Sequence, residues 1–177
     1  MKKFNNLIIL GPLAYAIHHF EEHIIFNFRE WRLRYFLDNN NISTEAVLSI
    51  LMSILLLAIF FHLISRNRAT SHIVLFLLIA TQVVNAVFHI FFSLYYYDFS
   101  PGTITAILLY IPLNILIIRS AFREGLLKNR FQLIFIFILG LSTFTIFEVI
   151  GPKIGPIVIL MCIIYYLWMT KLSFSKE

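Results

Sequence analysis

The sequence is poor in charged residues and has a single cysteine. Charged side chains make up 13% of the 177 residues and hydrophobic residues 60%, whereas an ordinary soluble domain has about 25% and 45–50%. So few charges cannot cover a water-facing surface, which excludes a soluble globular enzyme, and so many hydrophobic residues exclude a disordered chain. Cys162 has no partner with which to form an intramolecular disulfide.

Several sequence motifs that identify enzyme classes are also missing. The chain contains no GxGxxG fingerprint, no phosphate-binding loop and no HExxH motif of zinc proteases. Its six histidines are too few for the histidine boxes of membrane desaturases and hydroxylases. The paired glutamates resemble the EExxxR motif of intramembrane CAAX-type proteases, but Phe26 stands in place of the arginine.

Long uncharged stretches take up most of the chain. Crossing about 30 Å of hydrocarbon at about 1.5 Å per residue takes about 20 residues, and the absence of period-two alternation favours helices over barrel strands. The predicted spans are residues 4–28, interrupted by two glutamates, then 46–65, 69–97, 99–118, 131–147 and 154–170. We therefore predict an all-α, polytopic transmembrane bundle of about six (five to six) helices, forming a single domain over residues 1–177.

The basic residues are distributed unevenly among the predicted loops. With the N-terminus inside, ten fall in cytoplasmic segments and four in outer segments, a positive-inside bias that predicts cytoplasmic N- and C-termini. The ten are Lys2, Lys3, Arg66, Arg68, Arg119, Arg123, Lys128, Arg130, Lys171 and Lys176, and the four are Arg29, Arg32, Arg34 and Lys153. Because the membrane topology accounts for the net charge of +5, we expect no nucleic-acid partner. We expect the protein to be an integral protein of a bacterial plasma membrane.

Two short segments allow more than one interpretation. The N-terminal lysines, apolar run and Ala14-Tyr15-Ala16 imitate a signal peptide, but we expect this segment to be retained as the first helix. Residues 29–35, with Trp31 and Tyr35 among three arginines, are predicted to form a short helix on the outer interface.

The first hydrophobic segment contains the polar run His18-His19-Phe20-Glu21-Glu22-His23. A carboxylate at a bilayer centre costs about 2.5–3.5 kcal/mol on insertion scales, so a proton, an imidazole, a metal ion or water has to neutralise each one. At about 100° per residue, His18, Glu21 and Glu22 share one arc of the helix, while His19 and His23 lie on the adjoining face. The alternative is that Glu21 and Glu22 lie at a hydrated helix end and that the His23 side chain extends to the membrane interface.

Two other outward-running segments carry polar residues at the same predicted depth. Asn85 and His89 are spaced i, i+4, and Glu148 lies near the end of its segment. We predict that all three converge with the first segment in the outer third of the membrane. Helix-packing hydrogen bonds are the alternative role for Asn85 and His89. His62 and His72 are predicted to be interfacial, at the inner ends of their helices and outside this cluster.

Three motifs then occur in order: His18-x-x-Glu21-Glu22, Asn85-x-x-x-His89 and Ser100-Pro101-Gly102-Thr103. Their order in an apolar, helical chain resembles the HXXEE family of small membrane proteins, over residues from about 7 to at least 118. The resemblance implies a polar site that binds metal or catalyses, formed by His18, Glu21, Glu22, Asn85 and His89. No activity is established for that family.

The Ser-Pro-Gly-Thr segment is expected to form a tight turn, because proline fixes φ and glycine allows positive φ. The Thr103 hydroxyl is expected to cap the helix that follows. The N-terminus of that helix is a candidate site for an anionic headgroup.

The composition of the cluster predicts a divalent metal, with Zn²⁺ favoured and Fe or Mn as alternatives. The predicted ligands are His18, Glu22, His89, Asn85, His19, His23 and Glu148, and the predicted catalytic residues are Glu21, Glu22 and His18. We expect an enzyme, more readily a hydrolase or transferase than an oxidase, acting on a membrane lipid or another lipophilic small molecule. One alternative is a proton- or metal-coupled transporter, for which a homodimer could supply a path across the membrane. The other alternative is a non-catalytic accessory protein that binds a lipid or a partner.

Overall fold

The computed structural model describes residues 3–37 and 42–174, and the regular elements in these residues are all helices. Lys2 and Lys176, which count among the predicted cytoplasmic basic residues, lie outside this part of the chain. The elements are α1 (Lys3–Ile8), α2 (Leu10–Phe20), η1 (Glu21–Ile25), α3 (Phe28–Tyr35), α4 (Thr44–Ser65), α5 (Arg68–Leu78), η2 (Ile79–Val84), α6 (Asn85–Tyr95), α7 (Thr103–Thr105), η3 (Ala106–Tyr110), α8 (Ile111–Arg123), α9 (Arg130–Ile150), η4 (Gly151–Ile154) and α10 (Gly155–Phe174).

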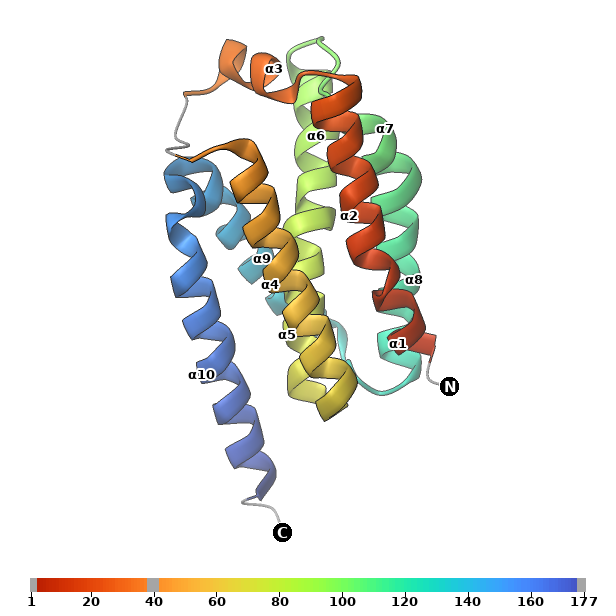
Figure 1. Ribbon diagram of the computed structural model, residues 1–177. Coiled ribbons are helices and arrows are strands. Elements are labelled where there is room, and N and C mark those ends of the chain that lie inside the picture. The colour runs from red at the N-terminus through yellow and green to blue at the C-terminus, as the bar shows by residue number, and fades with distance from the viewer. Residues whose placement is uncertain (1–2, 38–41, 175–177) are drawn as a thin grey trace.

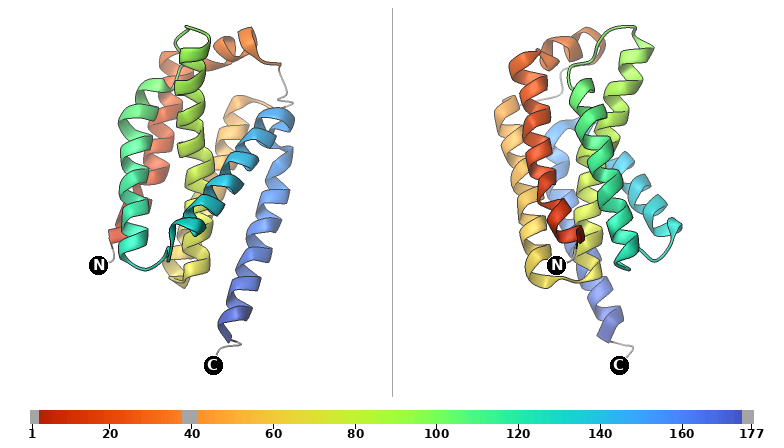
Figure 2. Two further views of the ribbon diagram at one scale, coloured as in Figure 1. Left: turned by 180° about the vertical axis from the view of Figure 1, so that it is seen from behind. Right: turned by 90° about the vertical axis from the view of Figure 1, so that its right-hand side faces the viewer.

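These elements join into six long helical segments, so the predicted all-helical fold is confirmed for the described residues. Four stretches are long and apolar enough to cross a membrane: Thr44–Ser65, Arg68–Tyr95, Thr103–Arg123 and Arg130–Lys171. The last contains both α9 and α10, which run antiparallel on either side of η4 (Figures 1 and 2). Helix α1 begins and α10 ends at the same end of the bundle (Figure 1). The side of a membrane that this end faces stays a prediction.

The first segment differs from the single continuous helix predicted from its composition. A turn at Ile9 separates α1 from α2, and α2 passes into the π-helical turn η1 before the chain bends at Phe26. Helix α3 then lies across the upper end of the bundle, roughly perpendicular to the long helices (Figure 1). The Asn27 side chain caps α3 by accepting a hydrogen bond from the Glu30 backbone N–H (3.1 Å).

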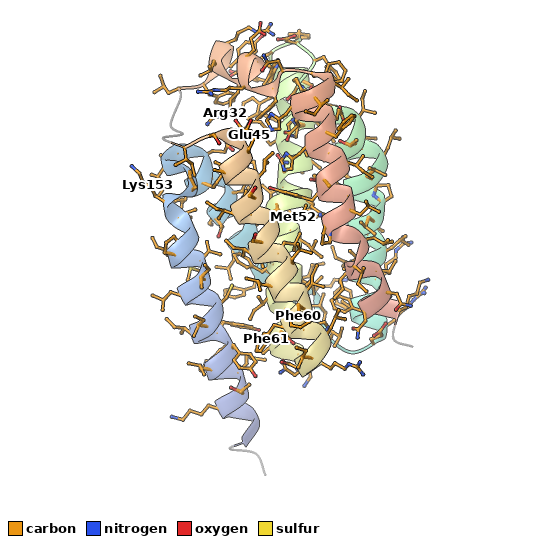
Figure 3. The ribbon with its side chains drawn as sticks, viewed as in Figure 1. Arg32, Glu45, Met52, Phe60, Phe61 and Lys153 are labelled. Carbon is orange, nitrogen blue, oxygen red and sulfur yellow. The ribbon has the colours of Figure 1, made fainter. Side chains whose placement is uncertain are left out.

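The segment α5–η2–α6 forms the centre of the bundle. Its residues from Val74 to Ala80 are all buried, as expected for a helix that is surrounded by other helices. They pack against Ile8 of α1, Leu55 of α4 and Ile136 of α9 in one apolar core. The outer helices instead turn apolar side chains outward, among them Phe60 and Phe61 on α4 (Figure 3).

His62 and His72 lie at the end of the bundle opposite α3, outside the cluster as predicted, and both are buried among the helices. His62 Nδ1 lies 2.9 Å from the Thr70 hydroxyl, and Nε2 lies 3.3 Å from the Asn5 amide oxygen. His72 Nε2 donates to the Leu126 carbonyl at 2.8 Å. These bonds satisfy the buried ring nitrogens, and the position of both residues at a membrane interface stays a prediction.

Candidate metal centre

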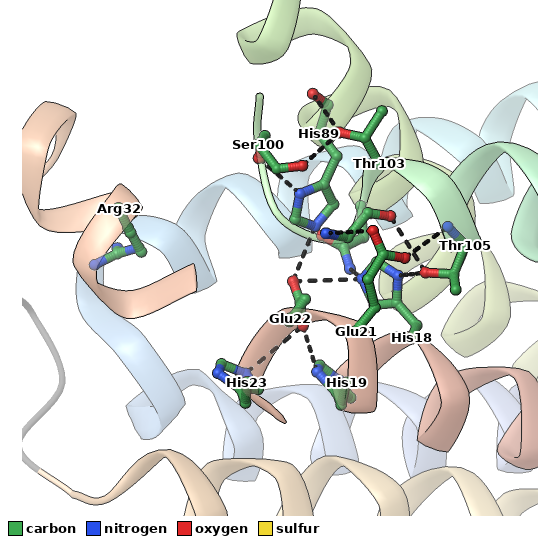
Figure 4. Close-up of polar contacts among 12 residues, drawn as sticks. His18, His19, Glu21, Glu22, His23, Arg32, His89, Ser100, Thr103 and Thr105 are labelled. Carbon is green, nitrogen blue, oxygen red and sulfur yellow. Dashed lines mark hydrogen bonds and ion pairs between the residues drawn. The ribbon is translucent and has the colours of Figure 1, made fainter. Parts of the chain in front are cut away.

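The polar cluster lies where η1 meets α6 and α7, beside the helix that carries Arg32 (Figure 4). Adjacent helical residues point about 100° apart, so Glu21 and Glu22, at the start of the π-helical turn Glu21–Ile25, meet different neighbours. Glu22 lies between the two histidine pairs, and Glu21 points toward α7 (Figure 4). The structure brings together His18, His19, Glu22, His23, Asn85 and His89.

Glu22 is the centre of this group. Its Oε1 lies 3.0 Å from His89 Nε2 and 3.4 Å from His18 Nε2. The side chains of both histidines are 0% exposed, and that of Glu22 is 3% exposed. Metal–ligand bonds of about 2.0–2.1 Å place neighbouring ligand atoms of a tetrahedron about 3.3 Å apart. Both distances from Glu22 Oε1 suit one Zn²⁺-sized ion, and the three ligand atoms all lie within 4.8 Å of one another.

Hydroxyl groups hold the far nitrogen of each of these imidazoles. His18 Nδ1 lies 2.8 Å from Thr105 Oγ1, and His89 Nδ1 lies 2.9 Å from Ser100 Oγ. The Asn85 amide nitrogen, which only donates, lies 3.0 Å from His18 Nε2, so the Nδ1 proton of His18 goes to Thr105 Oγ1. The Nε2 lone pair of His18 then faces both the Asn85 amide and, at 3.4 Å, Glu22 Oε1.

At 3.0 Å, His89 Nε2 and Glu22 Oε1 repel each other unless a cation lies between them. The cation can be a proton or a metal ion, and a hydrogen bond from Nδ1 to an outer partner is the arrangement found around metal-bound histidines. The donor set of two imidazoles and one carboxylate matches that of catalytic zinc sites, which keep the fourth position open. These residues therefore fit a divalent metal.

A second group shares the same carboxylate. Glu22 Oε2 contacts His19 Nδ1 and lies 3.7 Å from His23 Nε2. The two imidazoles are stacked, with centroids 5.7 Å apart and an interplanar angle of 15°. Their side chains are 14% and 21% exposed, so this half of the cluster is more open than the half that contains His18 and His89.

The Glu21 carboxylate is bound to the backbone at the start of α7. Oε1 accepts hydrogen bonds from the Gly102 N–H (3.0 Å) and the Ile104 N–H (3.1 Å), and Oε2 accepts one from the Thr105 N–H (2.7 Å). These N–H groups would otherwise lack partners at the helix N-terminus. The anion that this N-terminus holds is thus Glu21, not a headgroup.

The Ser-Pro-Gly-Thr turn covers the two buried histidines. Gly102 has φ of +99°, and a Cβ there would lie 2.8 Å from His18 Cε1 and 2.9 Å from His89 Cε1. The expected tight turn is confirmed, but the Thr103 hydroxyl does not cap the helix as expected, since it donates to the Ser100 carbonyl at 2.6 Å. The turn supplies the outer partner of His89 and leaves room for both imidazoles.

Asn85 and Glu148 have different surroundings from the three buried ligand atoms. Asn85 Nδ2 lies 3.0 Å from His18 Nε2, so an ion bound at this Nε2 would displace the hydrogen bond that the amide donates. Glu148 Oε2 forms an ion pair with Arg32, at 3.1 Å from Nη2 and 3.3 Å from Nε. The predicted convergence is therefore seen for Asn85 and His89, while Glu148 binds an arginine that we had expected at the outer interface.

A cavity of about 170 Å³ adjoins the open half of the cluster. It exceeds the volume of about 150 Å³ that suffices to bind benzene in an apolar protein cavity. Its walls combine polar residues with apolar side chains, including some of α4, α5 and α9. The polar residues include His19, Glu22, His23, Arg32 and Glu148, and the apolar ones include Leu51, Ile54, Leu77, Phe144 and Phe147.

Fold and site together define a strongly apolar, all-helical protein with a buried His/Glu cluster beside an amphipathic cavity. The chain belongs to the HXXEE family: the family model, described as a protein of unknown function with HXXEE motif, matches residues 9–117. This match confirms the resemblance drawn from the three motifs. No curated protein and no solved structure matches the chain significantly.

The roles of three residues in the site were not predicted from the sequence. Thr105 and Ser100 hold the buried imidazoles, and Arg32 pairs with Glu148 across the cavity. Ser100 and Thr105 flank the Gly102 turn, so the third motif was the available signal for them. Nothing in the local pattern of residues 29–35 distinguishes Arg32 from its neighbouring arginines.

Proposed function

We propose that this protein is a metal-dependent membrane enzyme whose ion is held by His18, His89 and Glu22. The observation that carries the proposal is the meeting of two Nε2 atoms and one carboxylate oxygen in a fully buried position next to an amphipathic cavity. A Zn²⁺ ion held by these residues would supply Lewis-acid chemistry toward an ester or phosphoryl oxygen. Fe and Mn remain the alternatives.

The residues of the chain then divide into three tasks. Ser100 and Thr105 fix the ring orientation of the two buried ligands through Nδ1. Glu21 joins η1 to α7 and has both oxygens engaged by backbone N–H groups, so we assign it to architecture rather than to proton transfer. His19 and His23, which line the cavity, are the groups placed to move a proton to or from a bound molecule.

The cavity supports an amphipathic substrate. An apolar chain fits among the side chains of α4, α6 and α9, and a polar end fits against Glu22 and the Arg32–Glu148 pair. A lipid or a similar lipophilic molecule has this division. A transport role has less support, because the polar side chains deeper in the bundle, Gln82 and Asn114, hydrogen-bond to each other and to backbone carbonyls, as residues that pack helices together do.

Metal content tests the proposal directly. Protein purified in detergent from zinc-supplemented cells is expected to retain at least one Zn²⁺ per chain, and His18→Ala/Glu22→Ala protein is expected to lose it. The matched control is His62→Ala, which removes a buried imidazole from the other end of the bundle. Equal trace metal in the wild-type protein and the double variant would contradict the proposal.

The catalytic part needs a second measurement. Wild-type protein loaded with Zn²⁺ and Glu22→Gln protein are incubated with vesicles of phosphatidylethanolamine and phosphatidylglycerol, and the lipids are followed by mass spectrometry. We expect cleavage or transfer products that depend on both the metal and Glu22. Products that form equally with the variant would show that another site produces them.

A further inference from the structure

The two oxygens of the Glu22 carboxylate face two different pairs of histidines (Figure 4). Oε1 faces the Nε2 atoms of His18 and His89, whereas Oε2 faces His19 Nδ1 and His23 Nε2. In each half, one carboxylate oxygen and two imidazole nitrogens lie within 4.8 Å of one another. This is the donor arrangement of a carboxylate that bridges two ions.

We propose that the cluster binds two divalent cations with Glu22 as the bridge. The buried ion takes His18, His89 and Oε1, and the cavity ion takes His19, His23 and Oε2. The inference rests on the proposed function and deepens it, since it replaces one ion by a pair and makes His19 and His23 ligands instead of proton-transfer groups. In two-metal enzymes the ions lie about 3.5–4 Å apart and act together on the oxygens of one substrate group.

The two positions differ in their surroundings. The histidines of the buried position are 0% exposed and hydrogen-bonded through Nδ1 to Ser100 and Thr105. His19 and His23 are partly exposed and line the cavity, and His19 Nε2 has no hydrogen-bond partner among the described residues. Outer partners of ligating histidines strengthen metal affinity about 10–100-fold, so the cavity ion binds more weakly than the buried one.

The charge of the pair indicates the class of substrate. Two divalent cations bring four positive charges, and the neutral imidazoles and the single Glu22 carboxylate neutralise only one of them. In a site this poor in water the remaining charge requires anionic ligands. The pair therefore selects an amphipathic molecule whose polar end is an anion such as a phosphate, placed at the end of the cavity where the cavity ion lies.

Zinc stoichiometry distinguishes the two positions. Chelator-stripped protein in detergent is titrated with Zn²⁺ by calorimetry, with and without inorganic phosphate, and bound metal is measured after gel filtration. Wild-type protein is expected to bind one tight and one weaker equivalent, with phosphate strengthening the weaker one at least several-fold. His19→Ala/His23→Ala protein is expected to keep only the tight equivalent, and Glu22→Gln protein to weaken both.

The outcomes separate this inference from the proposed function. If wild-type protein binds no Zn²⁺, both fail. If it saturates at one equivalent that the His19/His23 variant keeps and a His18→Ala/His89→Ala variant loses, the proposed function stands and the ion pair is overturned. A second equivalent that survives in the His19/His23 variant also overturns it.

The folding of each variant is checked separately from its metal binding. Helix content by circular dichroism and a monodisperse elution profile qualify each variant, with His62→Ala as the matched control, and His19→Gln/His23→Gln provides a milder change of the same ligands.

The bridge itself can be tested by electron paramagnetic resonance. In wild-type protein loaded with Mn²⁺, magnetic coupling between the two ions is expected to suppress the signal of isolated Mn²⁺. An uncoupled signal at full loading would overturn the bridge.

Discussion

Glu21 and Glu22 are chemically identical neighbours with different surroundings in the folded chain. The Glu22 carboxylate faces four imidazoles, and the Glu21 carboxylate faces three backbone N–H groups at the start of α7. Adjacent helical residues point about 100° apart, so each side chain meets different atoms. At the scale of the residue, the HXXEE motif therefore contains one candidate ligand and one structural anchor.

Gly102 gives a sharp test at this scale. In Gly102→Ala the new Cβ would overlap both buried imidazoles, at 2.8 and 2.9 Å from their Cε1 atoms, and a positive φ costs an alanine about 1–2 kcal/mol. We expect a lower unfolding temperature and at least a tenfold weaker Zn²⁺ affinity, measured by thermal shift and calorimetry.

The matched control is Gly125→Ala. Gly125 also has a positive φ, +72°, but a Cβ at this position would have no heavy atom within 4 Å. This variant is expected to lose stability through backbone strain alone and to keep wild-type Zn²⁺ affinity. Equal loss of affinity in both variants would show that the contact of Gly102 with the histidines is unimportant.

At the scale of the element, the site depends on how separate helices are joined. Glu21 joins η1 to α7, and the Arg32–Glu148 ion pair joins α3 to α9. Outside the bundle, Tyr35 of α3 donates a hydrogen bond to Asp98 at 2.9 Å, and this bond raises the pKa of the Tyr35 phenol. Helix α3 is thereby attached to the loop that precedes the Ser-Pro-Gly-Thr turn.

Glu21→Gln tests the link between η1 and α7. The amide keeps only one acceptor oxygen for three N–H groups and loses the charge, and hydrogen bonds to charged groups contribute about 1.5–3 kcal/mol each. We expect the unfolding temperature of metal-free protein to fall clearly, while the folded variant still binds Zn²⁺. Thermal unfolding in detergent and metal analysis measure the two effects.

Glu22→Gln is the companion variant for Glu21→Gln. It is expected to lose Zn²⁺ affinity, with a smaller loss of stability in metal-free protein. If the two variants behaved in the same way in both measurements, the division between anchor and ligand would be incorrect.

At the scale of the whole molecule, apolar side chains cover the outside of the bundle as well as its core. Leu57, Phe60 and Ile64 on α4 are each more than 60% exposed, which in water would form the large apolar patches that soluble proteins avoid. Arg32 and Lys153 lie near the end of the bundle that α3 covers (Figure 3). A hydrocarbon environment around the helices accounts for this distribution.

The predicted orientation can be measured with single cysteines. In a Cys162→Ser background, Glu30→Cys on α3 and Lys128→Cys in the α8–α9 loop provide exposed positions at opposite ends of the bundle. A membrane-impermeant maleimide is expected to label Glu30→Cys in intact cells and Lys128→Cys only after permeabilisation. The reverse pattern would contradict cytoplasmic termini.

The helical segments and the residue types of the site could be predicted from the sequence, because both depend on local chemistry. Uncharged runs mark the helices, and Glu21, Glu22 and the histidines stand out in an apolar chain. Packing against segments distant in the sequence could not be predicted in this way. The break at Ile9 and the burial of Arg32 and His62 depend on such packing.

The sequence by itself determined that the chain is helical and apolar, that it belongs to the HXXEE family, and that polar residues from its first and third segments meet. Only the tertiary structure decided what each of them contacts. Helical periodicity specifies the face on which a side chain lies, but the partners on that face come from other helices. For this reason two adjacent glutamates of one motif end in different roles, with Glu22 among the histidines and Glu21 at the N-terminus of α7.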